Sequence, residues 1–381
     1  MKLILRLNAI LLFSILVIFS SCNRQSTSQV TNGTLNGQDS TIVLGNAASE
    51  LADSILIIFQ DKNNNYWFGS NGQGVYRYDG KKLIHFTTKD GLCHNQVREI
   101  KEDKSGNVYI NTIGGISKFD GRVFTTLNPV ESNSPDGGWK LEPDDLWFVG
   151  NQEENGPFRY DGKTLYDLEF PKHYLEDDYP KRPWTPYQVY TIYKDSRGNM
   201  WFGTAVFGIC RYDGKSLNWM YEEHLSMVAG GGSFGIRSIL EDKDGKFWFC
   251  NTRFRYDVYP KSSPDSNKVV KGNTLINYTK DTGIVISKTQ NEDDRIYFMS
   301  VREDSKGDLW MVTYDDGVWR YDPSTALTTG SKNMTHYPIK NGGGTVFLYS
   351  IYQDHQGDLW LGTHTDGAYK FNGNTFEKFK F

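Results

Sequence analysis

A neighbouring glutamate and histidine are the side chains of this sequence whose types best suit proton transfer. Glu223 and His224 lie in a linking segment, shortly before the glycines at 230–232. A carboxylate and an imidazole can serve as acid and base when both reach one reacting atom. Adjacent residues on a loop usually point into solvent instead, so we expect a protein without its own catalysis. Glu223 and His224 are its two catalytic candidates.

Aromatic side chains gather with acids and bases in another linking segment, residues 171–187. Trp184 and Tyr187 could form a platform for a sugar ring, because aromatic rings offer a large rigid apolar surface beside a polar tip. With His173, they are our first candidates for ligand binding. The alternative interpretation is a segment that folds down and caps the elements beneath it, and the sequence leaves both open.

Two short segments place acids and one histidine together. They read Tyr314-Asp315-Asp316-Gly317 and His364-Thr365-Asp366-Gly367. Hard oxygen ligands favour Ca²⁺ or Mg²⁺, but Asp and Gly also occur together simply because they form turns. We therefore expect no cofactor, keep Ca²⁺ or Mg²⁺ as the alternative, and assign Tyr314, Asp315 and His364 to ligand binding.

The elements that must position these residues repeat along the chain. Each copy holds an apolar segment, an Asp, a turn with Gly and an aromatic strand, as in residues 195–204 and 354–363. Fixed self-similarity of this kind is typical of repeat architectures. One copy, the third, is degenerate and has Pro143 in its turn. The aromatic anchors are Trp67, Tyr109, Trp147, Trp201, Trp248, Trp310 and Trp360.

Each repeat reads as four strands. The apolar segment is the inner strand, as at residues 54–59, and the anchor strand and an Arg/Lys-Tyr strand follow. Asp-Gly pairs such as 79–80 and 213–214 are a strong hairpin signal and lead into an outer strand, as at residues 83–86.

A single sheet of this kind has two apolar faces and cannot stand alone. Stacking such sheets around an axis buries both faces, with the anchor tryptophans packed between neighbours. The sequence therefore predicts an all-β fold, a seven-bladed β-propeller of four-stranded antiparallel blades over residues 51–381. The two short acidic segments would then lie near the axis, and a strand at 40–44 could help to close the ring.

The start of the chain resembles an export signal. Residues 1–21 combine a short basic stretch with an apolar run that is too short to span a membrane, and Ser20-Ser21-Cys22 resembles a bacterial lipobox. We expect a lipoprotein signal peptide at 1–21, a lipidated Cys22, and a flexible tether over 22–50. An ordinary signal peptide or an uncleaved anchor is the alternative. Because no acidic run follows Cys22, an outer-membrane lipoprotein on the periplasmic side is favoured.

Composition excludes one large class of partner. The formal net charge of the chain is −4 and aromatic residues make up 14% of it. A mildly acidic surface does not provide the basic footprint of a nucleic-acid binder. The cysteines at 93, 210 and 250 are too few and too far apart for a disulfide framework.

The repeats resemble the two-component regulator propeller repeats found in bacterial sensors. The resemblance rests on the D-x-x-G-x-x-W-x-G-T pattern at 195–204, the G-x-x-R-Y-D-G hairpin at 208–214, and the linking stretch at 89–97, and it extends over residues 54–381. It implies ligand binding. Sensors of that family usually carry two such propellers, a β-sandwich, a transmembrane helix and a kinase, so a sensory role for this chain would need a partner.

We therefore expect a lipid-anchored extracytoplasmic binding propeller of the sensor type, without its own kinase. Its ligand would be a carbohydrate or a protein partner, such as an envelope protein or a sensor kinase, and the lipid would be its contact with the membrane. Two alternatives stay open: a lyase or hydrolase similar to streptogramin lyase, with Glu223 and His224 at its site, and a scaffold in an outer-membrane assembly.

Overall fold

The structure is a computed structural model, and it describes residues 45–132, 137–150, 153–179, 184–227, 233–260, 268–281, 283–284, 298–323, 334–341 and 344–381. Leu44–Phe381 form one compact unit. The predicted signal peptide, Cys22 and the strand expected at 40–44 lie outside the described residues. Of the expected tether, residues 46–48 instead form strand β1 (Asn46–Ala48), so the folded part begins earlier than residue 51.

Most repeats fold into antiparallel meanders whose strands pair in chain order. The first three complete ones are β2 (Ile55–Gln60), β3 (Tyr66–Ser70), β4 (Val75–Tyr78) and β5 (Leu83–Phe86); β6 (Val97–Glu102), β7 (Val108–Thr112), β8 (Gly115–Phe119) and β9 (Phe124–Leu127); and β14 (Val189–Lys194), β15 (Met200–Thr204), β16 (Ile209–Tyr212) and β17 (Leu217–Met220).

The later repeats follow the same plan. They form β18 (Ile239–Glu241), β19 (Phe247–Phe249), β20 (Arg255–Asp257) and β23 (Thr279–Asp281); β24 (Ser300–Glu303), β25 (Leu309–Val312), β26 (Val318–Tyr321) and β27 (Met334–Tyr337); and β30 (Leu348–Gln353), β31 (Leu359–Thr363), β32 (Ala368–Phe371) and β33 (Phe376–Lys378). A small hairpin, β28 (Lys340–Asn341) and β29 (Gly344–Thr345), precedes the last of them.

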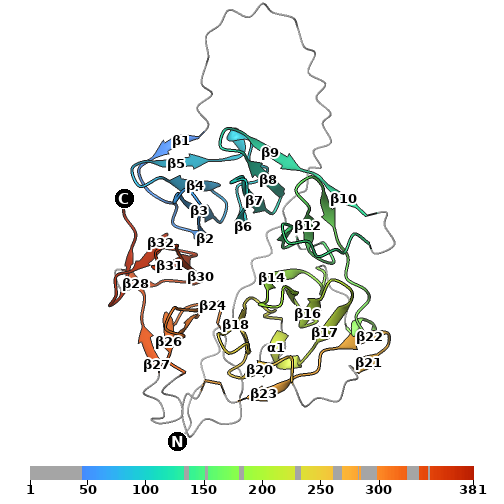
Figure 1. Ribbon diagram of the computed structural model, residues 1–381. Coiled ribbons are helices and arrows are strands. Elements are labelled where there is room, and N and C mark those ends of the chain that lie inside the picture. The colour runs from blue at the N-terminus through green and yellow to red at the C-terminus, as the bar shows by residue number, and fades with distance from the viewer. Residues whose placement is uncertain are drawn as a thin grey trace, which may run out of the picture. The chain divides into compact units, whose positions relative to one another are not determined.

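The sheets stand around a common axis, with β2, β6, β14, β18, β24 and β30 nearest to it (Figure 1). This arrangement is the β-propeller predicted from the repeats, and the described residues contain a single short α-helix, α1 (Glu223–Ser226), with 3₁₀ turns at Thr88–Asp90 and Glu176–Asp178. Within the described ranges, no helix is long and apolar enough to cross a membrane.

In every repeat except the third, the Asp opens the turn in the way the sequence indicates. Asp195 Oδ1 accepts hydrogen bonds from the backbone N–H groups of Arg197 at 3.0 Å and Asn199 at 2.8 Å. Gly198 follows with a φ of 87°, a left-handed conformation that glycine adopts without strain. The result is a tight hairpin that joins inner strand β14 to anchor strand β15.

The anchor side chains fill the space between neighbouring sheets. Trp201 is fully buried and its ring centre lies 4.6 Å from that of Phe247, in the next repeat. Trp310 packs in the same way on Phe371, at 5.0 Å. Burying an indole ring removes a large apolar surface from water, so these contacts stabilise the packing of neighbouring sheets.

The degenerate third repeat departs from the meander of four consecutive strands. It forms β11 (Leu146–Phe148), β12 (Phe158–Tyr160) and β13 (Leu165–Asp167), and among the described residues no inner strand precedes β11 in its sheet. Side chains of β6 hydrogen-bond the open edge of β11 instead. Glu99 Oε2 accepts from Val149 N at 2.7 Å, Arg98 Nη1 donates to Gly150 O at 2.8 Å, and Lys101 Nζ donates to Trp147 O.

Additional strands cover three outer edges. β1 pairs antiparallel with β5, β10 (Pro129–Glu131) pairs parallel with β13, and β22 (Asn273–Leu275) pairs parallel with β17 and antiparallel with β21 (Val269–Val270). The expectation of four antiparallel strands in every sheet is therefore wrong for these repeats: β1 and β22 with β21 extend two sheets beyond four strands, and the four-stranded sheet of the third repeat contains the parallel strand β10. Covering an outer edge protects its unpaired backbone groups from other chains.

The ring closes through side chains and one strand contact. β2 and β31 pair at Ile55 and Thr363, which joins the first and last repeats into a nine-stranded sheet. Phe379, after the last strand, packs between Trp360 at 4.9 Å and Phe68 at 5.8 Å. No strand from one end of the described chain completes the meander at the other end.

Candidate functional site

One position of the repeat faces the axis of the propeller. It lies five residues before the Asp that opens the turn, and we call it the ring position. In the six well-formed repeats it is occupied by Leu56, Arg98, Tyr190, Arg237, Met299 and Tyr349. All except Leu56 line a cavity of about 350 Å³, which we call the central cavity.

A recurrent β-bulge turns this position towards the axis. The register between inner and anchor strands shifts at Leu56, Arg98, Tyr190 and Tyr349, each the extra residue of its strand. Bulges bend a strand and re-aim a side chain, and they are frequent beside functional sites. In the fifth and sixth repeats, Arg237 and Met299 stand just before β18 and β24.

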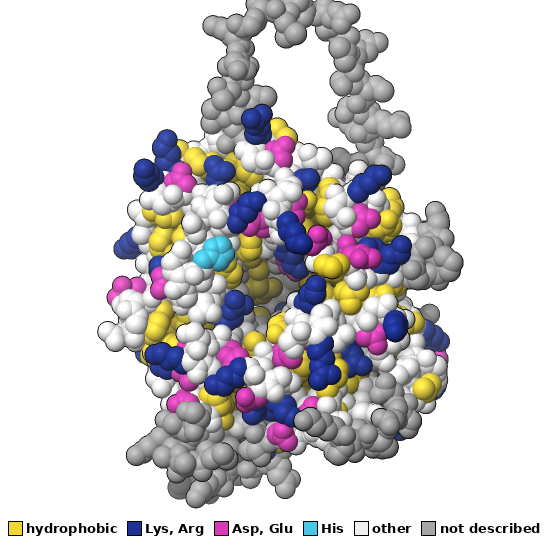
Figure 2. Space-filling model, viewed as in Figure 1, with side chains coloured by type: hydrophobic (Ala, Val, Ile, Leu, Met, Phe, Trp, Pro, Cys, Tyr) yellow, Lys and Arg dark blue, Asp and Glu magenta, His cyan; other side chains and the backbone are white. Residues whose placement is uncertain are grey.

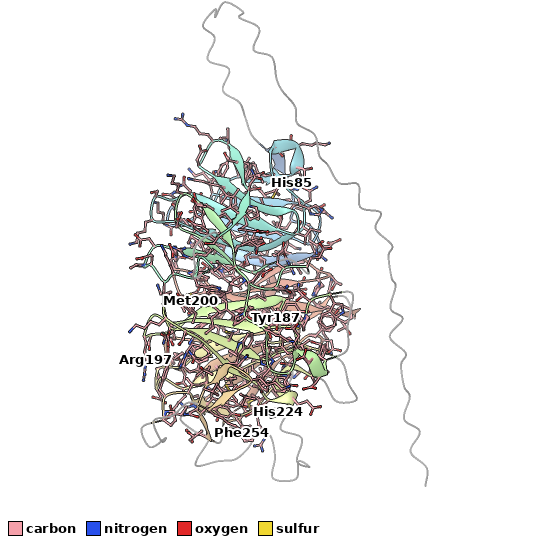
Figure 3. All side chains as sticks on the ribbon, turned by 90° about the vertical axis from the view of Figure 1, so that its right-hand side faces the viewer. His85, Tyr187, Arg197, Met200, His224 and Phe254 are labelled. Carbon is pink, nitrogen blue, oxygen red and sulfur yellow. The ribbon has the colours of Figure 1, made fainter. Side chains whose placement is uncertain are left out.

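The ring position lies towards the face of the propeller that carries the links between repeats. Inner strands run from these links to the Asp turns, and the ring position is near the start of each. Figure 3 turns the propeller edge-on, with Arg197 of an Asp turn on the left and His224 of a link further to the right. Figure 2 shows charged side chains of both signs around a central hollow on the face towards its viewer.

Arg237 is held in place by aromatic rings. Its guanidinium carbon lies 4.6 Å from the ring centre of Tyr190 and 5.1 Å from that of Phe234. Gly235 permits this packing, because a Cβ there would come within 2.4 Å of the Tyr190 ring. The Arg237 Nε is buried and has no hydrogen-bond partner among the described residues. Burial and the charge of Arg237 lower the pKa of His364.

The carboxylate of the central cavity, Glu99, already has hydrogen-bond and ion-pair partners within the protein. Glu99 accepts hydrogen bonds from Val149 N and from Asn111 Nδ2, the latter at 2.9 Å, and it lies 3.2 Å from Lys101 Nζ. Its charge is therefore balanced within the fold, and it is not available as a free base.

Two of the predicted binding residues meet beside this cavity. The ring of His364 lies 5.1 Å from Tyr349 of the ring position and 5.7 Å from Tyr314. Tyr314 also contacts Phe347 at 5.0 Å and is 45% exposed. These four residues, Tyr314, Phe347, Tyr349 and His364, form what we call the aromatic rim. It runs from the cavity to the surface.

The described parts of the link, residues 171–179 and 184–187, fold down as a cap, as the alternative interpretation had it. His173 is 1% exposed and lies between Phe207 and Trp219, at 4.5 and 4.7 Å. Burial lowers the pKa of His173 to about 3, so this imidazole is neutral. Tyr187 is 5% exposed and its hydroxyl accepts from His173 N at 2.6 Å. In this packing, His173 and Tyr187 do not present a surface to a ligand.

Trp184 lies half-buried against the same cluster as Tyr187. It is not among the residues that line the central cavity, so the structure does not bring it together with the aromatic rim.

The catalytic candidates do not converge. Glu223 is exposed, whereas His224 Nε2 lies 2.8 Å from Oε2 of the preceding Glu222. Glu222 also lies 2.7 Å from Lys280 Nζ and accepts from Tyr278 OH. Although burial opposes the charge, these donors lower the pKa of Glu222 to about 2. These contacts hold α1 against the fifth repeat, and His224 faces Glu222 rather than Glu223.

Asp315 is exposed, and it is not among the residues that line the central cavity. It borders an open hollow beside His336 and Lys340. In the described part of the chain, no three His, Cys, Asp or Glu side chains gather as they would around a metal ion.

Sequence reasoning missed the ring position, although a signal was present. The residues five before the repeat's Asp are Leu, Arg, Tyr, Arg, Met and Tyr, while the positions around them repeat closely. Variable residues at a fixed place in a regular repeat indicate a position that packing does not dictate.

The comparison with protein-family models matches the two component regulator propeller at residues 184–205 and 342–365. Both segments include an inner strand and its anchor strand, and the resemblance stated from the motifs is thereby confirmed. No curated protein is significantly similar to the chain.

Solved structures share the fold at low identity. The extracellular domain of the hybrid two component system BT4673 from B. thetaiotaomicron is 19% identical, with a TM-score of 0.55 over 85% of this chain and 39% of that one. This chain thus spans less than half of that domain. Streptogramin B lyase is 13% identical, with a TM-score of 0.55 over 84% of this chain and 94% of that one.

A third similar structure is PorZ of Porphyromonas gingivalis, described as a surface component of the type-IX secretion system. It is 15% identical, with a TM-score of 0.53 over 84% of this chain and 46% of that one. Identities this low show the propeller fold alone.

Proposed function

Because the chain carries two component regulator propeller repeats, we propose that it is a ligand-binding propeller of the sensor type that acts outside the cytoplasm. Its ligand, a carbohydrate or a segment of a partner protein, occupies the central cavity and contacts the aromatic rim.

One observation carries this proposal. Five repeats each contribute the same position to one cavity of about 350 Å³, and the residues there are two arginines, two tyrosines and a methionine. Ligand sites are concave, largely preformed, and combine apolar walls with a few placed polar groups. A cavity of this make-up fits a small polar ligand with an apolar face.

We also propose that the propeller has seven blades, one for each repeat. On this count the nine-stranded sheet comprises two blades, which meet at the Ile55–Thr363 pair. The third blade would consist of three meander strands with β6 side chains in place of the inner strand.

Lipidation at Cys22 and attachment to the outer membrane, on its periplasmic side, belong to the same proposal. The lipobox-like ending at 20–22 supports them, and the solved sensor domain of similar fold is extracellular. Labelling with a radioactive fatty acid, compared between the natural chain and Cys22→Ser, tests this part. Equal labelling of both would contradict it.

The alternatives receive less support from the geometry. A lyase would use Glu223 and His224, but these side chains point to different surroundings. A scaffold role would rest on the likeness to PorZ, which concerns the fold.

The test uses the full chain, purified in detergent, in a thermal-shift screen against oligosaccharides and Ca²⁺ or Mg²⁺. Ligands that bind the folded state raise its melting temperature. We expect Tyr349→Ala to weaken a bound oligosaccharide at least tenfold, and Trp184→Ala to leave its affinity unchanged.

A ligand whose affinity is insensitive to Tyr349→Ala would contradict the assignment to this cavity. A change in the ligand's mass that is lost in a Glu223→Gln, His224→Asn double variant would favour the lyase instead.

A further inference from the structure

We infer that the ligand of the central cavity carries an oxyanion group, and that Arg237 binds this group. The inference deepens the proposed function and rests on it, because both concern the same cavity. Carboxylate, sulfate and phosphate groups are all oxyanions of this kind. A sugar that bears one of them would also contact the aromatic rim.

The charge of the cavity is the first support. Among its lining residues the charged ones are Arg98, Glu99 and Arg237. Glu99 is balanced by Lys101 at 3.2 Å and by two N–H donors. Arg237, which has no acidic partner among the described residues, therefore leaves a positive charge in the cavity of a chain whose formal net charge is −4. A site opposite in sign to the whole molecule selects anions locally.

The surroundings of Arg237 are the second support. In the described part of the chain, no acidic side chain forms an ion pair with Arg237, whereas Arg159, Arg255 and Arg320 each pair with an aspartate of their own repeat. Arg237 instead stacks on Tyr190, which orients the planar guanidinium without consuming its donors.

The open donors of the Arg237 guanidinium are the third support. Among the described residues, no acceptor takes a hydrogen bond from this side chain, whose Nε is buried without a partner and closed to solvent. An oxyanion in the cavity would therefore accept from the two terminal nitrogens, in the two-pronged geometry typical of arginine. The ligand would use donors that the protein leaves open.

Arg98 provides a second positive group in the same cavity. Its Nη1 donates to Gly150 O at 2.8 Å, which fixes the side chain along the open edge of β11. The aromatic rim begins at Tyr349, also in the cavity, so an anionic group and an apolar ring face of one ligand could be bound together.

The experiment is isothermal titration of the full chain in detergent with four probes: trigalacturonate, a sulfated disaccharide, inorganic phosphate and neutral trigalactose. At least one anion is expected to bind ten or more times tighter than trigalactose, and to weaken as salt is raised. The first three probes distinguish carboxylate, sulfate and free phosphate as the source of the oxyanion.

Variants then test whether Arg237 binds the anion. Arg237→Gln is expected to weaken the anion at least tenfold and Arg237→Lys less, because lysine keeps the charge but not the two-pronged geometry. Arg122→Gln, at an exposed hairpin turn, changes charge equally and should have no effect. Melting temperatures of all variants show whether each is folded.

The outcomes separate the inference from the function on which it rests. Binding of no anionic probe, or anion binding unchanged in a folded Arg237→Gln, would overturn the inference. If trigalactose binds and loses affinity with Tyr349→Ala, the cavity is still the ligand site and the proposed function stands.

Discussion

The indole Nε1 of Trp201 donates a hydrogen bond of 2.8 Å to Oδ2 of Asp195, six residues earlier. The same bond joins Asp and Trp in four other repeats, and in the second repeat Tyr109 OH replaces the indole, at 2.9 Å from Asp103. One carboxylate oxygen thus closes the turn while the other holds the buried anchor. This pairing links the local turn to the packing between sheets.

Replacing that carboxylate should be costly. Asp195→Ala removes the acceptor for Trp201 Nε1, Tyr259 OH at 2.7 Å and Asn199 Nδ2 at 2.9 Å. Buried donors without partners cost about 1–3 kcal/mol each at most, so we expect the free energy of unfolding to fall by about 2–4 kcal/mol. Asp195→Asn keeps one carbonyl oxygen and should lose less. Urea denaturation measures both.

The control is Asp213→Ala, in an exposed Asp-Gly hairpin, where the loss should stay within about 1 kcal/mol. Equal losses at Asp195 and Asp213 would contradict a special role for the indole bond. Burial alone would raise the pKa of Asp195, but hydrogen bonds from Trp201, Asn199 and Tyr259 lower it below the usual value of 3.8. Its stabilisation is therefore present above that pH and is lost as pH falls through the folded pKa.

The substitute for the missing inner strand gives a second prediction. Glu99→Ala leaves Val149 N and Asn111 Nδ2 without the acceptor they share. We expect a loss of about 1–3 kcal/mol in the free energy of unfolding. Glu99→Gln retains one oxygen and should lose less than half of that amount.

Glu377→Ala is the matched control, because Glu377 accepts one bond from Asn372 on the exposed last hairpin. Denaturation curves that coincide for Glu99→Ala and Glu377→Ala would show that β11 does not depend on β6 side chains.

A third prediction concerns pH. Burial, followed by the charges of Glu154, Glu169 and Glu131, raises the pKa of Asp167 to about 6. A raised folded pKa means that the protonated form is preferred, so stability should increase as pH falls from 7 to 5. Because water screens a half-exposed group, the gain should be about 1 kcal/mol.

Asp167→Asn should provide this gain at pH 7 and remove the pH dependence, as melting temperatures across the range would show. Asp161 is the opposite case: burial raises its pKa, but N–H donors from Thr164 and Lys163 outweigh this and lower it. Asp161→Asn should therefore destabilise. A flat profile in the natural chain between pH 5 and 7 would count against the assignment.

The closure of the ring gives a fourth prediction. Phe379 packs on Trp360, Phe68 and Tyr78 at ring distances of 4.9, 5.8 and 5.7 Å. Because the ring is only half-buried, Phe379→Ala should cost about 1–2 kcal/mol, less than a core phenylalanine. Phe381→Ala, with a side chain 44% exposed, should cost less. Chemical denaturation compares the two, and a larger loss at Phe381 would contradict this account of closure.

The local sequence pattern predicted the propeller because the turn and the anchor of a repeat are both specified within ten residues. Asp195, Gly198 and Trp201 specify a hairpin and a buried ring without help from the rest of the chain. The third repeat shows the limit of such reasoning. Its lost inner strand is replaced by Arg98, Glu99 and Lys101 of another repeat, and nothing in the spacing of Asp145 and Trp147 indicates which side chains would do so.

The candidate site was predicted in part. Tyr314 and His364 were assigned from short loops expected near the axis, and the structure places them together beside Tyr349. His173 and Tyr187 were assigned from residue type alone, which cannot tell a stacking platform from a cap. The difference depends on whether the long link folds outward or onto Phe207, and that is decided by tertiary packing.

The bulge that turns the ring position towards the axis separates two tasks within one repeat. In the six well-formed repeats the anchors, six residues after the Asp, are Trp or Tyr, whereas the ring position, five residues before it, holds Leu, Arg, Tyr or Met. An exchange at the ring position alters the cavity without touching the indole bonds that hold adjacent sheets. Such a propeller can acquire a new specificity one repeat at a time, by single substitutions whose effects on the scaffold remain local.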